Sequence, residues 1–485
     1  MGRFRFSSFF LDERDLERGT GDAASRGPAD KRPPAFNIRP HDIRRTKYET
    51  MPTVTFKTLG CKLNQAETAM LTRAFLEHGY AIVPNGEKAD VTVINTCTVT
   101  GRSDAKCRQA VRSVLRRNPE STVIVTGCYP QVAVQEIEAI PGVDYILGVP
   151  DKLALFDHFS GPGKREAPFV RVSMQSLSKS ALPHNSGAYP NQTRAFLPIQ
   201  TGCDRRCAYC IVPLARGPSR SLKDSDVLGH AVQLIRKGYK EIVLTGVHVG
   251  EYGKDRSGAS ELPALLRRLI RLDASVRFRL SSLDPGDLTD ELVETVAAHP
   301  RICRHFHIAM QSGSDAILRA MNRRHSASEL RRKVARMLRI LGRTGLGADI
   351  ITGFPGETDA LFQETVDFIR SVPFTYFHVF PFSARKGTAA AGMEGQIPPR
   401  IRIERARRLR SIGEDIRRDF MDSFIGKDVS VLFESTKVRN RMRGFSSEYL
   451  RVEASYDPHW VNRIVPVRIV RPDKNALTGE IQTTP

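Results

Sequence analysis

Six of the eight cysteines in this 485-residue chain fall into two sets whose placement suits metal chemistry. The first cysteine set is compact: Cys203, Cys207 and Cys210 form a C-x3-C-x2-C pattern just after an apolar, strand-like run at 195–200. Three thiolates are one fewer than a closed zinc site or a fully ligated iron–sulfur cluster uses, and no His or fourth Cys follows at zinc spacing. The pattern therefore predicts a [4Fe–4S] cluster with one open iron. A degenerate zinc knuckle and three buried structural thiols are the alternatives.

The second cysteine set is spread along the chain, and each member directly follows a predicted strand. Its members are Cys61, Cys97 and Cys128, after the strands 53–58, 90–95 and 122–126. Because the carboxyl ends of neighbouring parallel strands share one edge of a sheet, these cysteines should meet in space. We predict a second cluster there, again with an open iron; three structural cysteines that happen to end strands are the alternative. Cys107 and Cys303 are interpreted as ordinary buried thiols.

The region around the second cysteine set alternates strand-like and helix-like patterns. Helices are expected at 67–78, 103–117 and 132–139, and a further short strand at 145–148. This alternation predicts a parallel α/β, Rossmann-like domain over 52–160. A polar linker is expected at 161–190. Residues 1–50 have little periodicity and are predicted to be a disordered extension, with Met51 as an alternative start of the protein.

Residues 191–421 continue the alternation over a longer stretch. Candidate strands lie at 196–200, 241–245, 276–281, 306–310, 346–351 and 376–380. Six strands are too few for an eight-stranded barrel, so we predict a partial, open (β/α)6 barrel whose chemistry lies in the loops after the strands. Gly246, Gly313 and Gly353 in those loops let the backbone approach a ligand closely. After a basic helix at 400–418, alternating runs within 424–485 predict a small β-barrel.

The charge balance favours a polyanionic partner. Lys and Arg exceed Asp and Glu by 21, and the pI is near 9.9, which suits nucleic acid or a membrane surface. No apolar run is long enough to span a membrane. In the predicted C-terminal barrel, one loop carries Lys437, Arg439, Arg441 and Arg443 beside Phe445 and Tyr449. Basic side chains next to aromatic ones suit single-stranded RNA; a charged hairpin loop is the alternative.

Taken together, these motifs resemble the radical S-adenosylmethionine methylthiotransferase family over roughly residues 52 to 475. The resemblance is carried by both cysteine sets, by a C-terminal barrel similar to a TRAM domain, and by short segments. These segments are 202–205, 244–248, Gln311-Ser312-Gly313-Ser314, Met321-Asn322-Arg323 and Gly353-Phe354-Pro355-Gly356-Glu357. After Cys61, the run Lys62-Leu63-Asn64-Gln65 is similar to the branch that acts on N6-threonylcarbamoyladenosine in tRNA. Ala309 departs from the family, where Pro is common.

The resemblance implies two [4Fe–4S] clusters and S-adenosylmethionine as cofactors, with no catalytic residue beyond the cluster ligands. The residues expected to bind S-adenosylmethionine are Tyr209, Thr245, Gly246, Ser282, Gln311, Ile351 and Gly353. Cys203, Cys207 and Cys210 would generate a radical, and Cys61, Cys97 and Cys128 would hold the cluster that presents sulfur to carbon 2 of the modified adenine. The implied partners are tRNA, an electron donor such as a flavodoxin or ferredoxin, and a sulfur source, for a cytoplasmic monomer.

Three other functions remain open at this point. Two are methylthiotransferases of other branches, which act on isopentenyladenosine in tRNA or on an aspartate of a ribosomal protein. The third is a non-catalytic iron–sulfur protein that binds RNA. It would explain the charge and one cluster, but not six loops suited to a cofactor.

Overall fold

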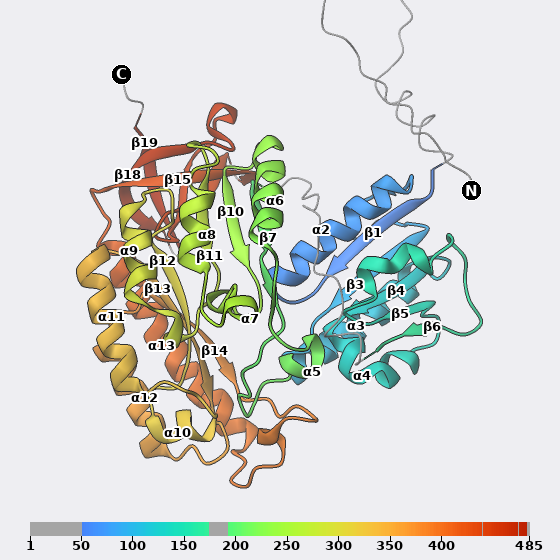
Figure 1. The fold of residues 1–485 in the computed structure, drawn as a ribbon, viewed down its shortest axis with the longest axis horizontal. Helices are drawn as coiled ribbons and strands as arrows, with labels where there is room; N and C mark the ends of the chain where they lie inside the picture. Colours follow the sequence, from blue (N-terminus) through green and yellow to red (C-terminus); the bar gives the residue numbers. More distant parts are fainter. Residues whose placement is uncertain (1–50, 174–192, 439, 474, 483–485) are drawn as a thin grey trace, which may run out of the picture. The chain divides into compact units, whose positions relative to one another are not determined.

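The computed structural model describes residues 51–173, 193–438, 440–473 and 475–482, and gives only the backbone of 435–438. Its N-terminal part is a six-stranded parallel sheet in the order β2-β1-β3-β4-β5-β6, of which Figure 1 labels β1 and β3 to β6. The strands are β1 (Thr53–Thr58), β2 (Ala81–Ile82), β3 (Val91–Thr96), β4 (Thr122–Gly127), β5 (Tyr145–Leu147) and β6 (Phe169–Arg171). The predicted parallel α/β domain is therefore confirmed. β6, which falls within the expected linker 161–190, pairs with β5.

The helices of this domain are α2 (Lys62–Glu77), α3 (Gly101–Arg117) and α4 (Cys128–Glu138), with a 3₁₀ segment η1 (Lys152–Asp157). Two of them begin earlier than their apolar patterns indicate: α2 starts at Lys62 and not at 67, and α4 starts at Cys128 and not at 132. The first turn of α2 is polar but tightly held. The buried Asn64 amide donates to the carbonyls of Leu59 and Thr96, at 2.9 and 2.8 Å. A hydrophobic pattern does not reveal such polar contacts.

The central part contains six parallel strands. They are β7 (Arg194–Pro198), β10 (Glu241–Thr245), β11 (Arg277–Leu280), β12 (His305–Gln311), β13 (Gly345–Thr352) and β14 (Tyr376–Pro381). Two three-stranded sheets, β11-β10-β7 and β12-β13-β14, are joined through parallel bridges such as Leu283 with Ile308. The predicted partial barrel is confirmed, with each strand within two residues of its expected ends.

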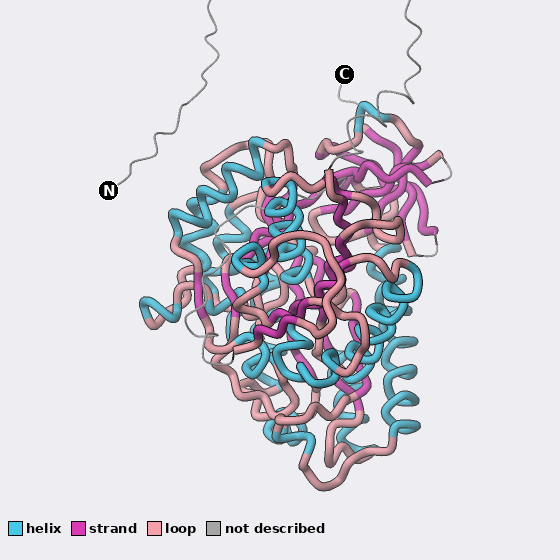
Figure 2. Tube along the Cα trace, turned by 90° about the vertical axis from the view of Figure 1, so that its right-hand side faces the viewer, coloured by secondary structure: helices cyan, strands magenta, loops and turns pink. Residues whose placement is uncertain are grey.

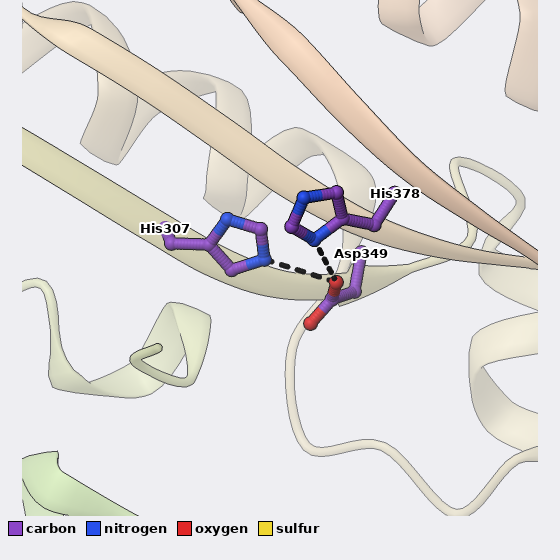
Figure 3. Close-up of side chains that lie close together, drawn as sticks. All are labelled: His307, Asp349 and His378. Atoms are coloured by element: carbon purple, nitrogen blue, oxygen red, sulfur yellow. Dashed lines mark ion pairs between the residues drawn. The ribbon is translucent and has the colours of Figure 1, made fainter. Parts of the chain in front are cut away.

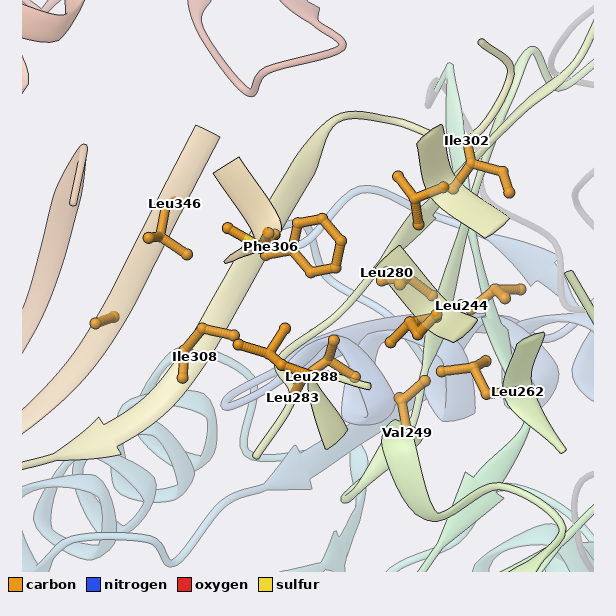
Figure 4. Packing of buried hydrophobic residues seen from close by; sticks show 14 of the residues in the cluster. Leu244, Val249, Leu262, Leu280, Leu283, Leu288, Ile302, Phe306, Ile308 and Leu346 are labelled. Carbon is orange, nitrogen blue, oxygen red and sulfur yellow. The ribbon is translucent and has the colours of Figure 1, made fainter. Parts of the chain in front are cut away.

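Helices accompany the strands along the chain and alternate with them. The longer ones are α6 (Asp224–Arg236), α8 (Leu262–Leu269), α9 (Asp290–Ala298), α11 (Ala327–Leu341), α12 (Asp359–Ser371) and α13 (Pro399–Asp422). Short elements in the loops are β8 (Gln200–Thr201), α5 (Val212–Arg216), β9 (Arg220–Ser221), α7 (Lys254–Ser257) and α10 (Asp315–Ala320). The core formed by strands and helices includes Leu244, Phe306, Ile308 and Leu346, all fully buried (Figure 4). Truncating a side chain such as Phe306 to Ala would cost about 3–5 kcal/mol.

The C-terminal part is a closed barrel in the order β15-β16-β17-β19-β18, which confirms the predicted small β-barrel. In Figure 2, its strands form the magenta group near the C-terminus. Its strands are β15 (Asp428–Val438), β16 (Arg441–Ser446), β17 (Arg451–Ser455), β18 (Ile464–Asp473) and β19 (Ala476–Ile481). Arg277 and Arg279 of β11 attach it to the central sheet by donating to the carbonyls of Phe445 and Ser446, at 2.7 and 2.8 Å. Within the described parts of the chain, no helix has the length and apolar character needed to cross a membrane.

Candidate active site with two cysteine sets

The first cysteine set lies on a tight loop between β8 and α5. The Cys203 amide donates to the carbonyl of Gly217 at 3.0 Å, and the Cys210 amide donates to the carbonyl of Cys207, also at 3.0 Å. Gly202 has φ +72°, and a Cβ there would lie 1.8 Å from the Pro218 carbonyl oxygen. Only glycine fits this position. The loop is therefore closed at its base, and its three half-buried cysteines line one cavity.

Hydrogen-bond donors surround the sulfurs of this set. The Arg205 amide lies 3.4 Å from the Cys203 sulfur, and the Arg323 guanidinium lies 3.5 Å from the Cys207 sulfur. Burial raises the pKa of Cys210 to about 12, so this thiol needs a metal to become a thiolate. Three sulfurs around a cavity, with nearby donors to stabilise thiolates, fit a cluster with one open iron.

Two further residues beside this set carry charge into the site. Arg323 is fixed by Asp284 at 2.6 Å and by the carbonyl of Ala309 at 2.7 Å. His248 contacts Asp287 at 2.8 Å. Burial opposes a charged imidazole, but hydrogen bonds with Asp287, Cys203 and Glu251 raise the pKa of His248 to about 12.

The site prediction did not include Arg323 or His248. Arg323 lies in the segment 321–323 and His248 in 244–248. Both segments carry the family resemblance, which is the sequence signal that points to these two residues. Sequence spacing could not show that Arg323, just after α10, faces Cys207.

The cavity beside the first cysteine set measures about 360 Å³, a size suited to a cofactor or small substrate. Four of the seven residues expected to bind S-adenosylmethionine line it, namely Tyr209, Ser282, Gln311 and Ile351. Gln311 has φ +70°, a strained value of a kind that clusters at functional sites. The other three face protein: Thr245 is buried, a Cβ at Gly246 would lie 2.8 Å from the Gln200 carbonyl oxygen, and one at Gly353 would lie 2.4 Å from the Arg402 side chain.

The second cysteine set lies at one edge of the N-terminal sheet. Cys61, Cys97 and Cys128 follow β1, β3 and β4, which are neighbours in that sheet. A Cβ at Gly60 would lie only 2.6 Å from the Cβ of Cys97, so the chain beside Cys61 packs directly on Cys97. The structure thus places Cys61 beside Cys97, and Cys128 at the end of the next strand on the same edge of the sheet.

The electrostatics of this set also fit a metal cluster. Burial, followed by the charges of Cys128 and Cys61, raises the pKa of Cys97 to about 12, so the Cys97 thiol needs a metal to become a thiolate. Val99 and Thr100, just after Cys97, line the same cavity as the first set. Cys107 is fully buried and donates to the Cys97 carbonyl at 3.4 Å, as expected for a structural thiol.

A polar cluster lies on the inner face of β12, β13 and β14 (Figure 3). One oxygen of Asp349 accepts from His307 at 2.9 Å and from His378 at 3.3 Å. Although burial acts in the opposite direction, these histidines hold the pKa of Asp349 well below its usual value. One nitrogen of each imidazole and one oxygen of the carboxylate lie within 4.8 Å of one another. Both imidazoles share one carboxylate oxygen, and the Tyr376 hydroxyl contacts His307 at 2.9 Å, so the cluster is complete as a hydrogen-bonded network.

Lys62 is the charged residue nearest in sequence to the second cysteine set. Its side chain is half-buried, and it has no hydrogen bond or ion pair with any described residue. Burial first, and then the charges of Arg279 and Arg194, lower its pKa to about 8, while Glu241 and Asp349 act in the opposite direction. These four neighbours belong to the central strands, so the Lys62 amine lies within electrostatic range of the partial barrel.

The predicted RNA-binding residues are only partly covered by the structure. Arg439 and the side chain of Lys437 lie outside the described residues. Arg441 and Arg443 lie on β16, and not in one loop as expected, because β15 and β16 form a hairpin with a short turn. Glu453 pairs with both, at 3.4 Å from Arg441 and 2.6 Å from Arg443, and offsets part of their charge.

The aromatic residues expected to stack on RNA bases pack against protein instead. Phe445 and Tyr449 stack on each other with centroids 4.9 Å apart. The guanidinium of Arg194 lies 4.4 Å from the ring of Phe445, and His305 stacks on Tyr449 at 4.5 Å. The interpretation of these rings as base-stacking groups is wrong, because they fill the contact between the small barrel and the central strands.

Family models match both parts of the chain that carry a cysteine set. Residues 53–148 match a family described as "Uncharacterized protein family UPF0004", and residues 197–369 match the radical SAM superfamily. The chain is 36% identical, over 87% of its length and 94% of the relative, to threonylcarbamoyladenosine tRNA methylthiotransferase MtaB of Bacillus subtilis. It is 32% identical, over 87% of its length and 91% of the relative, to tRNA-2-methylthio-N(6)-dimethylallyladenosine synthase of Alkaliphilus oremlandii.

Among solved structures, the fold is similar to the radical S-adenosylmethionine methyltransferase TsrM of Kitasatospora setae. The TM-score is 0.52 at 15% identity, covering 70% of this chain and 77% of that chain. The domain order, the two cysteine sets and the relatives together define a class: this is a radical S-adenosylmethionine enzyme. More narrowly, the chain belongs to the tRNA methylthiotransferase family.

Proposed function

We propose that this enzyme transfers a methylthio group to carbon 2 of N6-threonylcarbamoyladenosine at position 37 of tRNA. One observation carries the proposal: residues next to both cysteine sets line a single cavity. Val99 and Thr100 approach from the side of Cys97, and all three cysteines of the first set face the same space. A base held there would be within reach of both centres.

The two cysteine sets divide the chemistry. When bound, the first cluster and S-adenosylmethionine would supply a radical able to attack an unreactive C–H bond, and the second cluster would supply sulfur, with a further S-adenosylmethionine supplying methyl. Ser282, Gln311 and Ile351 would hold S-adenosylmethionine on the cavity wall. Arg323 would stabilise the thiolate of Cys207, to which it donates.

The choice of substrate rests on the N6 substituent. The relatives named above act on adenosines that carry either a threonylcarbamoyl or a dimethylallyl group. The first group has a carboxylate, and the second is apolar. Lys62 supports the first, because it is a half-buried cation beside Cys61 that has no partner among the described residues. A substrate carboxylate would satisfy this amine, whereas an apolar group would leave it desolvated and unpaired.

The remaining partners follow from the reaction. The first cluster needs a one-electron donor, such as a flavodoxin or ferredoxin, and the second needs a sulfur source to be rebuilt after each turnover. The C-terminal barrel, which is similar to a TRAM domain, would contact tRNA. We propose a cytoplasmic monomer, since one chain supplies both cysteine sets and the cavity lined by residues next to them.

Two alanine variants test the division of roles. Cys203→Ala should abolish formation of 5′-deoxyadenosine from S-adenosylmethionine and reductant. Cys97→Ala should retain that cleavage but give no 2-methylthio product, measured by nucleoside mass spectrometry of tRNA bearing threonylcarbamoyladenosine. Normal product from Cys97→Ala would refute the sulfur-donor role, and product only on dimethylallyladenosine would refute the substrate assignment.

A further inference from the structure

Three charged side chains form a buried network where the two cysteine sets approach each other. Glu67 on α2, Lys152 in η1 and Arg216 on α5 are 4%, 1% and 3% exposed. The Arg216 guanidinium meets the Glu67 carboxylate with two nitrogens, at 2.8 and 3.1 Å, and the Lys152 amine donates to the same carboxylate. Burial opposes ionisation of Glu67, but Arg216 and Lys152 lower its pKa to about 2.

The network contains one more positive charge than negative charge. Two cations share one carboxylate, and the other groups that Arg216 contacts are neutral: the Asn64 side-chain oxygen at 2.8 Å and the Thr201 hydroxyl at 3.4 Å. A buried charge without a counter-charge is costly. The second cysteine set lies against this network, because Cys128 packs with Ala215, the residue before Arg216. With a metal bound, the thiolates of Cys128 and Cys61 would supply the missing counter-charge to Arg216.

Arg216 is also the point at which both sets are connected. On one side, its guanidinium holds the Asn64 side chain, whose oxygen lies 3.7 Å from the Cys61 sulfur. On the other side, the carbonyl of the next residue, Gly217, accepts a hydrogen bond from the Cys203 amide at 3.0 Å. Cys61 and Cys203 are thus both connected to the C-terminal end of one short helix, α5.

We propose that Arg216 and Lys152, offset by Glu67, form the counter-charge of the second iron–sulfur cluster and raise its reduction potential. This inference rests on the proposed second cluster but not on the choice of tRNA base. Three thiolates give that cluster an anionic ligand set, and reduction adds one more negative charge. The excess positive charge of the network favours the reduced form, since the net charge around a cluster is a main determinant of its potential.

The test measures the reduction potential of the second cluster alone. The Cys203→Ala, Cys207→Ala, Cys210→Ala variant leaves the second set as the only cluster site in the full-length chain, and its iron and sulfide content reports whether that set binds a cluster at all. In this background, Arg216→Gln should lower the midpoint potential, because it removes a positive charge. Glu67→Gln should raise it, because it removes a negative one. Arg116→Gln, on the exposed last turn of α3, is the control and should leave the potential unchanged.

A second measurement does not depend on redox titration. Cluster binding stabilises the folded state, and the gain in melting temperature on reconstitution reports that stabilisation. Compared with the parent, the gain in melting temperature should be smaller in Arg216→Gln and larger in Glu67→Gln. Failure of Arg216→Gln to bind a cluster counts as a smaller gain. Shifts of the same sign in both variants, or no shift in either, would overturn the counter-charge role. A parent variant without iron or sulfide would instead refute the second cluster itself.

Discussion

At the scale of single residues, neighbouring side chains at the second cysteine set have different roles. Cys61 turns its sulfur toward Asn64, while Lys62, the next residue, extends toward the central strands. The start of α2 thus separates Cys61, a proposed cluster ligand, from Lys62, which we propose binds the substrate carboxylate. Under this proposal, one turn of backbone would hold both the second cluster and the N6 substituent.

The role of Lys62 can be tested by substitution. In Lys62→Gln, KM for tRNA bearing threonylcarbamoyladenosine should rise about 10- to 100-fold, because a hydrogen bond to a charged group contributes about 1.5–3 kcal/mol. Lys62→Arg should retain much of the affinity. Cleavage of S-adenosylmethionine without tRNA, measured as 5′-deoxyadenosine, should not change in either variant. An equal loss of this cleavage in both variants would show a structural role instead.

At the scale of elements, one buried carboxylate organises the contact between the central strands and the small barrel. Glu241 of β10 is fully buried and pairs with Arg277 at 2.7 Å and with Arg279 at 2.9 Å. The same arginines donate to carbonyls of the barrel. Loss of the Glu241 charge would therefore affect both the β10–β11 pair and the docking of the barrel.

We expect Glu241→Gln to destabilise the protein by about 3–5 kcal/mol, because it leaves buried arginines without their partner. Burial opposes ionisation of Glu241, but Arg279 and Arg277 hold its pKa well below the usual 4.5. A lowered folded pKa means that this stabilisation is complete above the unfolded pKa and is lost as the pH falls toward the folded pKa. The difference from wild type should be constant from pH 6 to 8 and shrink below about pH 4.5.

Urea unfolding across this pH range measures the effect. Glu291→Gln, which removes an exposed pair with Arg267, is the matched control and should change stability by less than about 1 kcal/mol. A similar loss in both variants would contradict the role of Glu241.

Much of the element order could be predicted from the sequence, because alternating apolar patterns mark strands whatever their partners. The six central strands and the three strands that precede cysteines are examples. The network of Glu67, Lys152 and Arg216 could not be predicted, since its members lie up to 149 residues apart and pair only after folding. The packing of Phe445 and Tyr449 could not be predicted either, because composition does not show whether a ring faces solvent or a neighbouring domain.

At the scale of the whole molecule, the net charge of +21 suits tRNA, but part of it is already paired internally. Glu453 contacts Arg441 and Arg443 on the small barrel, where we expect contact with phosphates. A phosphate of the nucleic acid would therefore have to compete with Glu453 for these two arginines.

Two variants should change tRNA affinity in opposite directions. Arg443→Gln should weaken binding severalfold and reduce the slope of log K against log salt by about 1, the value for one phosphate contact. Glu453→Gln should strengthen binding, because it releases both arginines. Filter binding across a salt series measures both effects. An unchanged slope in both variants would exclude this face of the barrel from the tRNA contact.

The two cysteine sets also differ in how much of the chain must fold before their sulfurs meet. The first is closed within one loop, and loops of about ten residues close in roughly 10–100 ns. The second needs β1, β3 and β4 in register, a non-local arrangement that forms slowly. On partial unfolding, the second cysteine set should therefore lose its arrangement before the first. An ageing preparation would go on consuming S-adenosylmethionine after it had stopped modifying tRNA, so the ratio of 5′-deoxyadenosine to product would report the integrity of the N-terminal sheet.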